Sequence, residues 1–444
     1  MIKPSRLLLA WLAGLLGLTL LLGSLKALRV ELPGFIDATA WGLLLAMALL
    51  LALDAEMARR LPRPLLQRQL APSLALGRWS EVQLQLSHHG QRPLSLDIID
   101  HLPAGLCGQG LRQHMQLGTG ETARFSYRVR PLRRGQVDFT RCEVLLHGPL
   151  GLCSRRHHLP LPGSVRVYPD FARLFNGQLL AVDNWLSQLG VRQRQRRGLG
   201  LEFNQLREFR EGDSLRQIDW KATARQGTPI AREYQDERDQ QVVFMLDCGR
   251  RMRSQDGELA HLDHALDACL LLAYVALRQG DAVGLLSFAS DTPRQVAPRK
   301  GQHQLSRLLS SVYDLESSQQ PADFNDAATR LLATQKRRAL VVIVTNLRDD
   351  DDEELLGAVN RLGRQHRVLV ASLREQVLDD LRHAPVHDWA QALAYCGTVE
   401  YLSARQALHD RLAALGVPLI DVRPAELGAE LVTRYLGLKK AGTL

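Results

Sequence analysis

The residues whose types and spacing could do chemistry are concentrated in one stretch, LREFREGDSLRQIDWKATARQGTPIAREY, which covers residues 206–234. Carboxylates and guanidinium groups alternate there around a single tryptophan. Positioned carboxylates can carry out acid–base catalysis, and clustered cations can bind phosphate. No pattern marks a substrate pocket, however, and charges at this density usually pair with one another or stay solvated. We predict a structural ion-pair network, with a partner or ligand surface as the alternative. The candidate residues are Arg207, Glu208, Gly212, Asp213, Arg216, Asp219, Trp220 and Arg225.

The rest of the sequence lacks the local motifs of common enzymes. It has no Gly-x-Ser-x-Gly elbow, no phosphate-binding Gly-x-x-x-x-Gly-Lys loop and no His-Glu-x-x-His pair. The six cysteines are scattered, which suits a reducing compartment and argues against a zinc site or a disulfide framework. The adjacent pairs His88-His89 and His157-His158 point to opposite faces of a strand, so neither pair is expected to share a metal ion. We expect no enzyme, and keep an unrecognised envelope enzyme as an alternative.

The net charge of +9 permits binding to nucleic acid or to an anionic membrane surface, but it decides neither. The most basic run, RQRQRRG at residues 192–198, has no interleaved aromatic residues. We therefore predict a solvated linker there, and no nucleic-acid partner.

Two uncharged apolar runs stand near the start of the chain, Leu7–Ser24 and Ala38–Leu53. They predict membrane-spanning helices at about 7–25 and 36–54, within a hairpin of residues 1–60. The first run lacks a small-x-small cleavage site and the second follows almost at once, which favours an anchor over a cleaved signal peptide. Two buried core helices are the alternative, but neither run has the polar face that such helices usually show.

Basic residues near the ends of these runs predict the orientation of the hairpin. Lys3 and Arg6 precede the first run, and Arg59 and Arg60 follow the second. The short connection carries charges of both signs. The positive-inside rule therefore favours both termini on the cytoplasmic side.

The remaining chain divides by its hydrophobic period. Residues 70–170 alternate apolar and polar side chains between Gly and Pro, which predicts an antiparallel β-sandwich. Residues 171–240 form a linker that includes the charged stretch. Residues 241–440 alternate short apolar runs with amphipathic segments, which predicts an open α/β sheet.

The charged stretch thus joins the two domains, and its own elements can be predicted. Gly212-Asp213 suits a turn, after which Ser214 and Gln217 suit a capping box. A helix over residues 215–226 would follow and end at Gly227. We expect Trp220 to pack on the α/β domain.

The motif LREFREGDSLRQIDWKATAR, followed by VVFMLD, closely resembles the signature of the bacterial domain-of-unknown-function family fifty-eight. The upstream segments RPLRRGQVDF, GPLGLCSRR and VRVYPD are similar to its β region, so the resemblance covers most of the chain from about residue 75 onward. It implies two N-terminal membrane helices, a domain similar to von Willebrand factor A domains, and association with a MoxR-type AAA+ ATPase.

Domains of the von Willebrand type often hold Mg²⁺ through Asp-x-Ser-x-Ser after the first strand, with a Thr and an Asp from later loops. The edge of an open α/β sheet where the parallel strands end is a common ligand site, and Mg²⁺ requires near-octahedral oxygen ligands. This chain departs from that pattern. Asp247 is present, but Gly249 and Arg251 replace the serines, and Asn346 follows Thr345 where an acidic residue is usual. We expect Asp247 to pair with an arginine or cap a helix, with no resident cofactor; Mg²⁺ binding is the alternative.

These observations predict a membrane-anchored interaction protein without enzymatic activity. The resemblance implies that it works with a MoxR-type ATPase in assembling or maturing envelope or metalloprotein complexes. We place the hairpin in the bacterial inner membrane, with the folded domains in the cytoplasm as the positive-inside rule favours. A cation-dependent adhesion or receptor module is the alternative.

Overall fold

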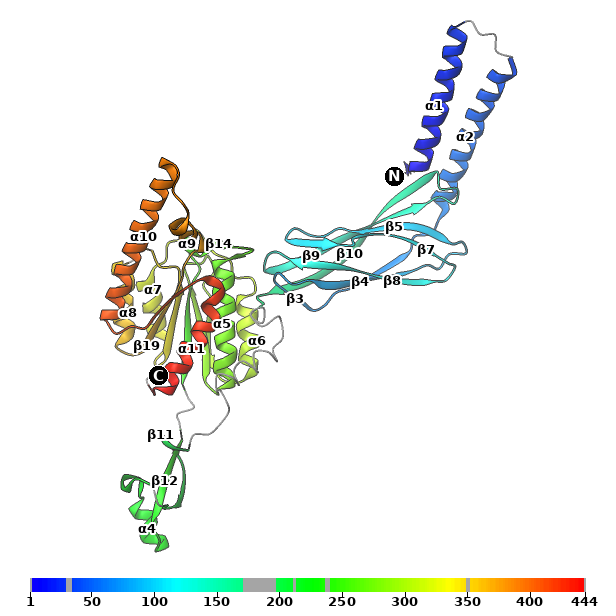
Figure 1. Ribbon diagram of the computed structural model, residues 1–444. Helices are drawn as coiled ribbons and strands as arrows, with labels where there is room; N and C mark the ends of the chain where they lie inside the picture. Colours follow the sequence, from blue (N-terminus) through cyan, green and yellow to red (C-terminus); the bar gives the residue numbers. More distant parts are fainter. Residues whose placement is uncertain are drawn as a thin grey trace. The chain divides into compact units, whose positions relative to one another are not determined.

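The computed structural model describes residues 2–28, 34–170, 197–210, 213–235, 240–348 and 352–442. The chain divides into two units, Met1–Tyr168 and Pro169–Leu444. The first unit combines two helices with a β-domain, and the second combines a small β-hairpin module with an α/β domain (Figure 1). The fold is therefore mixed α/β with several sheets.

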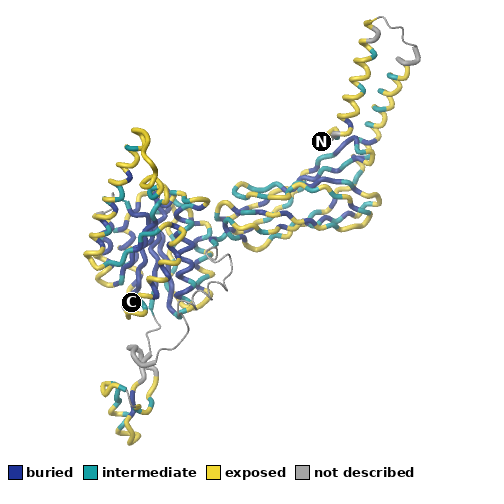
Figure 2. The backbone as a smooth tube through the Cα atoms, in the orientation of Figure 1, coloured by how far each residue is buried: buried dark blue, intermediate teal, exposed yellow. Residues whose placement is uncertain are grey.

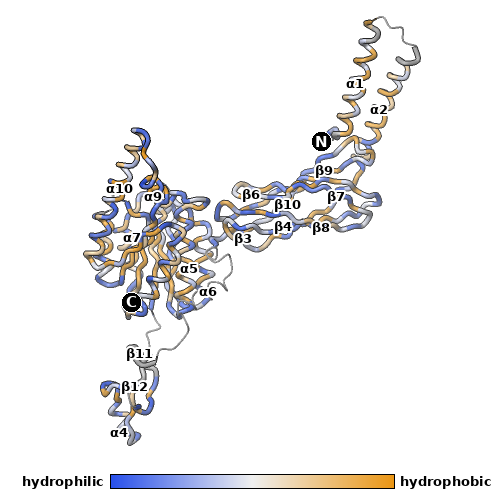
Figure 3. The backbone as a smooth tube through the Cα atoms, in the orientation of Figure 1, coloured by the Kyte–Doolittle hydropathy of each residue, from blue (hydrophilic) through white to orange (hydrophobic). Residues whose placement is uncertain are grey.

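The first unit begins with the helices α1 (Arg6–Ala27) and α2 (Gly34–Arg60). Both are long and apolar enough to cross a membrane, by length and composition. Only 6% of each apolar window is buried, so the alternative of two buried core helices is wrong for the described residues. The apolar colouring runs along both helices in Figure 3. Helix α2 extends six residues beyond the predicted end at residue 54. Contacts of these last turns with the β-domain stabilise the extension.

The β-domain is built from two sheets whose apolar side chains face each other. One sheet has the order β1-β10-β9-β5-β7 with β3 beside β10, and the other has the order β2-β4-β8-β6. All pairs are antiparallel except β3 with β10. The strands are β1 (Ile2–Pro4), β2 (Leu65–Gln69), β3 (Ser73–Ala75), β4 (Ser80–Ser87), β5 (Leu94–Asp100), β6 (Leu106–Gln109), β7 (Arg112–Leu117), β8 (Thr122–Pro131), β9 (Gly135–His147) and β10 (Cys153–Tyr168).

A buried carboxylate, that of Asp100, links the two sheets. Arg68 of β2 forms an ion pair with Asp100 of β5 at 2.6 Å, and the Tyr127 hydroxyl of β8 donates to the same carboxylate at 2.5 Å. The predicted sandwich is thus confirmed in outline. The sandwich also includes strands β1 and β2, which lie before the predicted span of 70–170. The sequence did not indicate them because these short edge strands show too little apolar–polar alternation.

The last turns of α2 are fixed to the β-domain by a buried carboxylate. Asp54 accepts hydrogen bonds from the amides of Leu150, Leu152 and Cys153 at 2.9, 2.9 and 2.7 Å. Leu150 and Leu152 belong to the turn between β9 and β10, and Cys153 is the first residue of β10. A Cβ atom on Gly148 would lie 2.3 Å from Asp54 Oδ1, so the turn can close on the carboxylate only with glycine there.

The α/β domain has a six-stranded sheet of order β17-β16-β13-β18-β19-β20. Edge strand β17 is antiparallel and the other five strands are parallel. The strands are β13 (Gln241–Asp247), β16 (Ala282–Phe288), β17 (Gln295–Arg299), β18 (Leu340–Thr345), β19 (Arg367–Leu373) and β20 (Leu419–Val422). The predicted open sheet is confirmed, and its buried strands form the dark centre of the domain in Figure 2.

Helices cover both faces of this sheet, and consecutive residues of β13 enter two separate cores. Val242, Phe244 and Leu246 pack on one side against α5 (His261–Arg278), α6 (Gln302–Val312) and α11 (Leu427–Lys440). Val243 and Met245 pack on the other side against α7 (Phe324–Thr334), α8 (Asp352–Gly363) and the end of α10 (Trp389–Ala414). The short helix α9 (Gln376–His383) precedes α10.

The charged stretch forms a module of its own. Strands β11 (Arg197–Glu208) and β12 (Ile230–Gln235) pair antiparallel, and a 3₁₀ turn at Leu215–Gln217 and helix α4 (Trp220–Gln226) lie between them in sequence. We call the described residues 205–210 and 213–235 the signature module. Most of the basic run 192–198, which we predicted to be a linker, lies outside the described residues.

Candidate functional site

The helix of the signature module starts later than the sequence predicted. Ser214 caps only the 3₁₀ turn. Ile218 then forms a bridge with Ala231, and the Asp219 amide donates to the Ile230 carbonyl at 2.8 Å. This pairing with β12 holds residues 218–219 extended, so one helix over 215–226 is wrong. Helix α4 ends at Gly227 as predicted, in a left-handed conformation with φ of 74°.

Asp219 both starts α4 and ties it to β12. Its Oδ1 accepts from the amides of Lys221 and Ala222, each at 3.0 Å, and its Oδ2 accepts from Arg232 Nε at 2.9 Å. The Ala222 amide, followed by Arg232, lowers the pKa of this carboxyl group. The sequence had placed the cap five residues too early, because Ser214 and Gln217 also fit a capping pattern.

A second carboxylate, Asp213, closes the turn after β11. Both of its oxygens accept from the Arg207 guanidinium at 2.7 Å, and Oδ2 also accepts from the Arg210 amide at 2.8 Å. The Arg207 hydrogen bonds, helped by the Arg210 amide, lower the pKa of Asp213 to about 2. The predicted ion-pair network therefore exists for Asp213 and Asp219. Gly212 lies outside the described residues.

The remaining candidates of the module face solvent. Trp220 is 71% exposed and Leu215 is 73% exposed. The side chains of Glu208, Arg216 and Arg225 are exposed as well. Trp220 is therefore not buried within its own module, and its packing on the α/β domain stays a prediction. Trp220 occupies the first turn of α4 directly after its cap, and the Asp219 contacts that fix the helix turn this side chain outward.

The second group of candidates meets where the central strands of the α/β sheet end. Asp247 is the last residue of β13, and Thr345 is the last residue of the neighbouring β18. Thr345 Oγ1 donates to Asp247 Oδ2 at 2.6 Å, and the Gly249 amide donates to Asp247 Oδ1 at 2.7 Å. Asp247 and Thr345 are both fully buried. The sheet thus brings together two of the positions that the sequence singled out.

Arg251 supplies a positive charge to this buried carboxylate. Its Nε lies 3.7 Å from Asp247 Oδ2, and one terminal nitrogen donates to the Asn346 carbonyl at 3.3 Å. Arg251 is only 2% exposed. The prediction that Asp247 pairs with an arginine is confirmed.

The donor set at Asp247 does not suit Mg²⁺. A Cβ atom on Gly249 would lie 2.7 Å from the Gln320 carbonyl oxygen, so a serine at this position would displace that loop. The Arg251 guanidinium adds a permanent cation where a ligand hydroxyl would be needed. Mg²⁺ prefers several free oxygen ligands in octahedral geometry, and here both Asp247 oxygens already accept hydrogen bonds from the chain.

Asn346 connects this centre to residues that the sequence did not reveal. Its amide nitrogen donates to Glu375 Oε1 at 2.9 Å, and its side-chain oxygen accepts from Arg405 at 3.3 Å. Arg405 is 3% exposed and also donates to Ser372 Oγ, at 2.6 Å, and to Asp421. Arg405 thus ties together the ends of β18, β19 and β20.

The positions of some of these residues could have been recognised from the topology. Ser372 and Glu375 stand at and just after the end of β19, where side chains of a parallel sheet converge. Arg405 lies in the middle of the long helix α10, and its spacing there gives no signal of burial.

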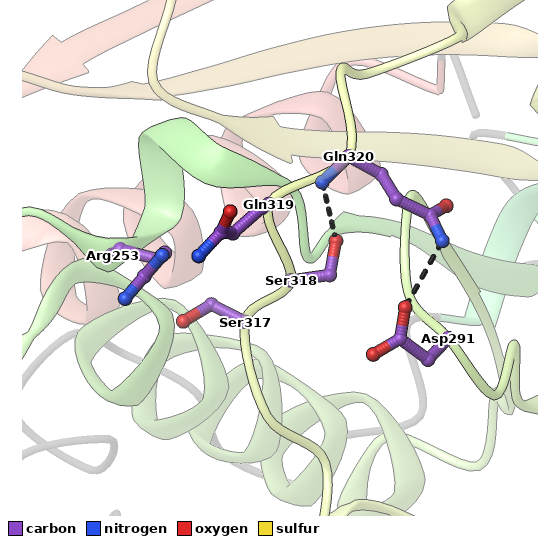
Figure 4. A pocket seen from close by; sticks show the side chains of 6 residues that line it. All are labelled: Arg253, Asp291, Ser317, Ser318, Gln319 and Gln320. Carbon is purple, nitrogen blue, oxygen red and sulfur yellow. Dashed lines mark hydrogen bonds between the residues drawn. The ribbon is translucent and has the colours of Figure 1, made fainter.

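An open hollow lies beside this centre (Figure 4). Gln320 lines this hollow. Its carbonyl accepts a hydrogen bond from the Arg250 amide at 3.0 Å, so the hollow adjoins the turn after β13. Gln320 Nε2 also donates to Asp291 Oδ1 at 3.0 Å. Ligand pockets are usually lined mainly by apolar side chains, whereas the side chains around this hollow are all polar: Arg253, Asp291, Ser317, Ser318, Gln319 and Gln320.

Comparisons with solved structures give only weak likenesses. The PapD-like domain 7 of human CEP192 is 17% identical, with 23% of this chain and 84% of that domain covered and a TM-score of 0.18. A FixG-related protein from Vibrio parahaemolyticus is 9% identical, with 24% and 98% covered and a TM-score of 0.18. Salmonella alpha-2-macroglobulin is 16% identical, with 35% and 9% covered and a TM-score of 0.20. At these scores they support no conclusion about this chain, and no curated protein matches it.

A family model gives the informative match. It covers residues 205–413, which include the signature module and the strands β13, β16, β18 and β19. The match is narrower than the resemblance from residue 75 onward that the sequence suggested, and the sandwich lies outside it. Residues 205–413 belong to the family whose model is described as protein of unknown function DUF58.

Proposed function

We propose that this protein is a membrane-anchored, non-enzymatic adaptor that docks a partner protein through its signature module. The partner that we propose is a MoxR-type AAA+ ATPase acting in the assembly or maturation of envelope or metalloprotein complexes. The resemblance of the central motif to the family signature supports this choice of partner.

The observation that carries the proposal is the exposed surface of the module. Its acidic residues Asp213 and Asp219 are held in local pairs, which fixes the backbone. Trp220, Leu215, Arg216 and Arg225 are left exposed on that fixed frame. Tryptophan and arginine are the residues most enriched among those that dominate binding energy at protein interfaces. A rigid module that presents them to solvent suits protein recognition better than catalysis.

The α/β domain belongs to this proposal as a von Willebrand factor A-like domain. Numbered along the chain, its strands have the order 3-2-1-4-5-6, which is the order of a doubly wound sheet. The Asp247–Arg251 pair supports a variant that recognises its partner without a metal ion. The same pair disfavours the alternative of a cation-dependent adhesion module.

Membrane anchoring rests on α1 and α2. Exposed large apolar residues recur along both helices, among them Trp11, Leu16, Trp41 and Leu45. A water-soluble chain rarely exposes so continuous an apolar surface, whereas a bilayer covers it. We place the helices in the bacterial inner membrane with the folded domains in the cytoplasm. Protease treatment of spheroplasts should leave the C-terminal part of the chain intact. Digestion of this part would show that the opposite orientation is correct.

The partner can be tested by purifying the full chain from detergent extracts at native abundance and identifying bound proteins by mass spectrometry. Purifications would run with ATP, without nucleotide and with EDTA. An AAA+ ATPase whose recovery depends on nucleotide is the expected result. EDTA also removes the Mg²⁺ of the ATPase, so Asp247→Asn is run beside it, and capture by this variant should persist.

Two tryptophan variants locate the docking surface. Trp220→Ala should lose the ATPase. Trp389→Ala removes a tryptophan of α10 that is 80% exposed, and this variant should retain the ATPase. Recovery of envelope proteins without any ATPase would overturn the proposed partner, and loss of the ATPase in Trp389→Ala alone would move the docking surface to α10.

A further inference from the structure

The outer face of the sandwich holds a carboxylate that strand geometry should leave exposed. On β5, Leu96 and Ile98 point into the core, and Asp97 between them points to the opposite face. Asp97 is nevertheless only 6% exposed. Side chains of the two neighbouring strands, His114 of β7 and His147 of β9, cover it.

The two histidines converge on the same oxygen of Asp97. His114 lies directly opposite Asp97 in the register, and its Nδ1 is 2.7 Å from Oδ1. His147 Nε2 lies 3.5 Å from that same Oδ1. The two ring centroids are 5.6 Å apart. The three ligand atoms all lie within 4.8 Å of one another.

We propose that Asp97, His114 and His147 form a binding site for a transition-metal dication, with Zn²⁺ as the best fit. Zinc binds histidine nitrogen and carboxylate oxygen at about 2.1 Å in tetrahedral geometry, which separates neighbouring ligand atoms by roughly 3.4 Å. The present distances of 2.7 and 3.5 Å bracket that separation. Small movements of the two rings would complete the site.

The surroundings fit an ion with an open coordination position. Arg112 binds the other carboxylate oxygen, Oδ2, at 2.8 Å, which fixes the orientation of Asp97 and leaves Oδ1 directed at the histidines. The His114 side chain is 55% exposed, so an ion can enter from solvent and keep a water molecule as its fourth ligand. Three protein ligands and one open position are the arrangement of zinc and related metals in reactive sites.

A neighbouring cluster provides an internal comparison. Glu143 of β9 lies 3.2 Å from His101 Nε2 and 4.0 Å from His158 Nδ1, and Arg156 binds its other oxygen at 2.7 Å. One of its histidines is thus farther from the carboxylate than either histidine is from Asp97. Glu143→Gln is therefore a matched control for Asp97→Asn, with the same loss of charge on the same sheet face.

The test uses the full chain in detergent with an affinity tag that contains no histidine. Metal is removed with a chelator, the chelator is removed, and ZnCl₂ is titrated against a chromophoric competitor. We expect one Zn²⁺ per chain, with affinity reduced at least tenfold in His114→Ala and in Asp97→Asn. His89→Ala, which removes an exposed histidine of the same domain, and Glu143→Gln should bind as the parent chain does.

Co²⁺ gives a readout of geometry that does not depend on affinity. Its visible absorption should show the strong bands of a tetrahedral site, and His114→Ala should abolish them. Because His114 is exposed, this variant should keep the circular dichroism and thermal unfolding of the metal-free parent chain. Absence of saturable zinc binding, or zinc binding that survives in His114→Ala and is lost in Glu143→Gln, would overturn the proposal.

Discussion

Replacing Arg251 with alanine should destabilise the α/β domain strongly. The substitution leaves Asp247 fully buried and removes the guanidinium 3.7 Å from its Oδ2. Two unit charges at that distance attract by about 4.5 kcal/mol at an effective dielectric constant of about 20. Breaking one partner out of a buried pair typically costs about 3–5 kcal/mol. The Thr345 and Gly249 hydrogen bonds to Asp247 remain, so we expect about 4 kcal/mol.

Amide hydrogen exchange of the full chain, read by mass spectrometry, can measure this loss domain by domain. A single melting temperature would not, because the chain has two units and two-state unfolding cannot be assumed. A loss of about 4 kcal/mol should speed exchange in the β13 and β18 peptides by roughly a thousandfold. Peptides of the sandwich should be unchanged.

Two variants sharpen the result. Arg251→Lys keeps the charge but loses the planar fork, so its exchange should fall between that of the parent chain and that of Arg251→Ala. Arg251 lies in a short 3₁₀ turn, Arg250–Arg253. Arg253→Ala removes an exposed arginine of that turn and should leave exchange unchanged. Parent-like exchange of β13 and β18 in Arg251→Ala would refute the account of the buried pair.

Other consequences follow for residues in both units. Asp54→Asn weakens three hydrogen bonds to the β9–β10 turn and should lower the stability of the sandwich by about 2–4 kcal/mol. Gly148→Ala should also destabilise this turn, through its clash with Asp54. Unchanged amide exchange in the turn would contradict both predictions. Trp220→Ala should leave amide exchange in the signature module unchanged, because removing an exposed side chain costs less than about 0.5 kcal/mol, and faster exchange there would show that its side chain is packed. Because the pKa of Asp213 is lowered to about 2, its contribution is present above the ordinary carboxyl pKa and disappears as pH falls through about 2. Pepsin cleavage within the signature module should therefore rise between pH 4 and pH 2, and Asp213→Asn should already be cleaved at the fast rate at pH 4.

Much of the architecture could be predicted because it depends on period and length. The alternation in β4 and the continuous apolar run of β13 each reflect which faces of a strand are buried. Strand β1 could not be predicted, because three residues show no period. Its pairing with β10 depends on distant sequence.

The candidate sites likewise include residues that the sequence could place and residues that it could not. Asp247, Thr345 and Asn346 could be placed together because they lie at the ends of neighbouring parallel strands or directly after them. The exposure of Trp220 on its own module could not be predicted, since hydrophobicity favours burial while the cap at Asp219 and the pairing of Ile218 set the direction of the helix. The Asp97–His114–His147 cluster went unrecognised because its residues come from three strands whose register the sequence does not specify.

The most direct test of the docking surface is photo-crosslinking in living cells from a benzoylphenylalanine placed at position 220. The same probe at position 389 serves as the control, because both parent tryptophans are highly exposed. We predict that position 220 crosslinks to a AAA+ ATPase and that position 389 does not. Crosslinking of the ATPase from position 389 alone, or from neither position while the ATPase still copurifies, would contradict the claim that the signature module is the docking surface.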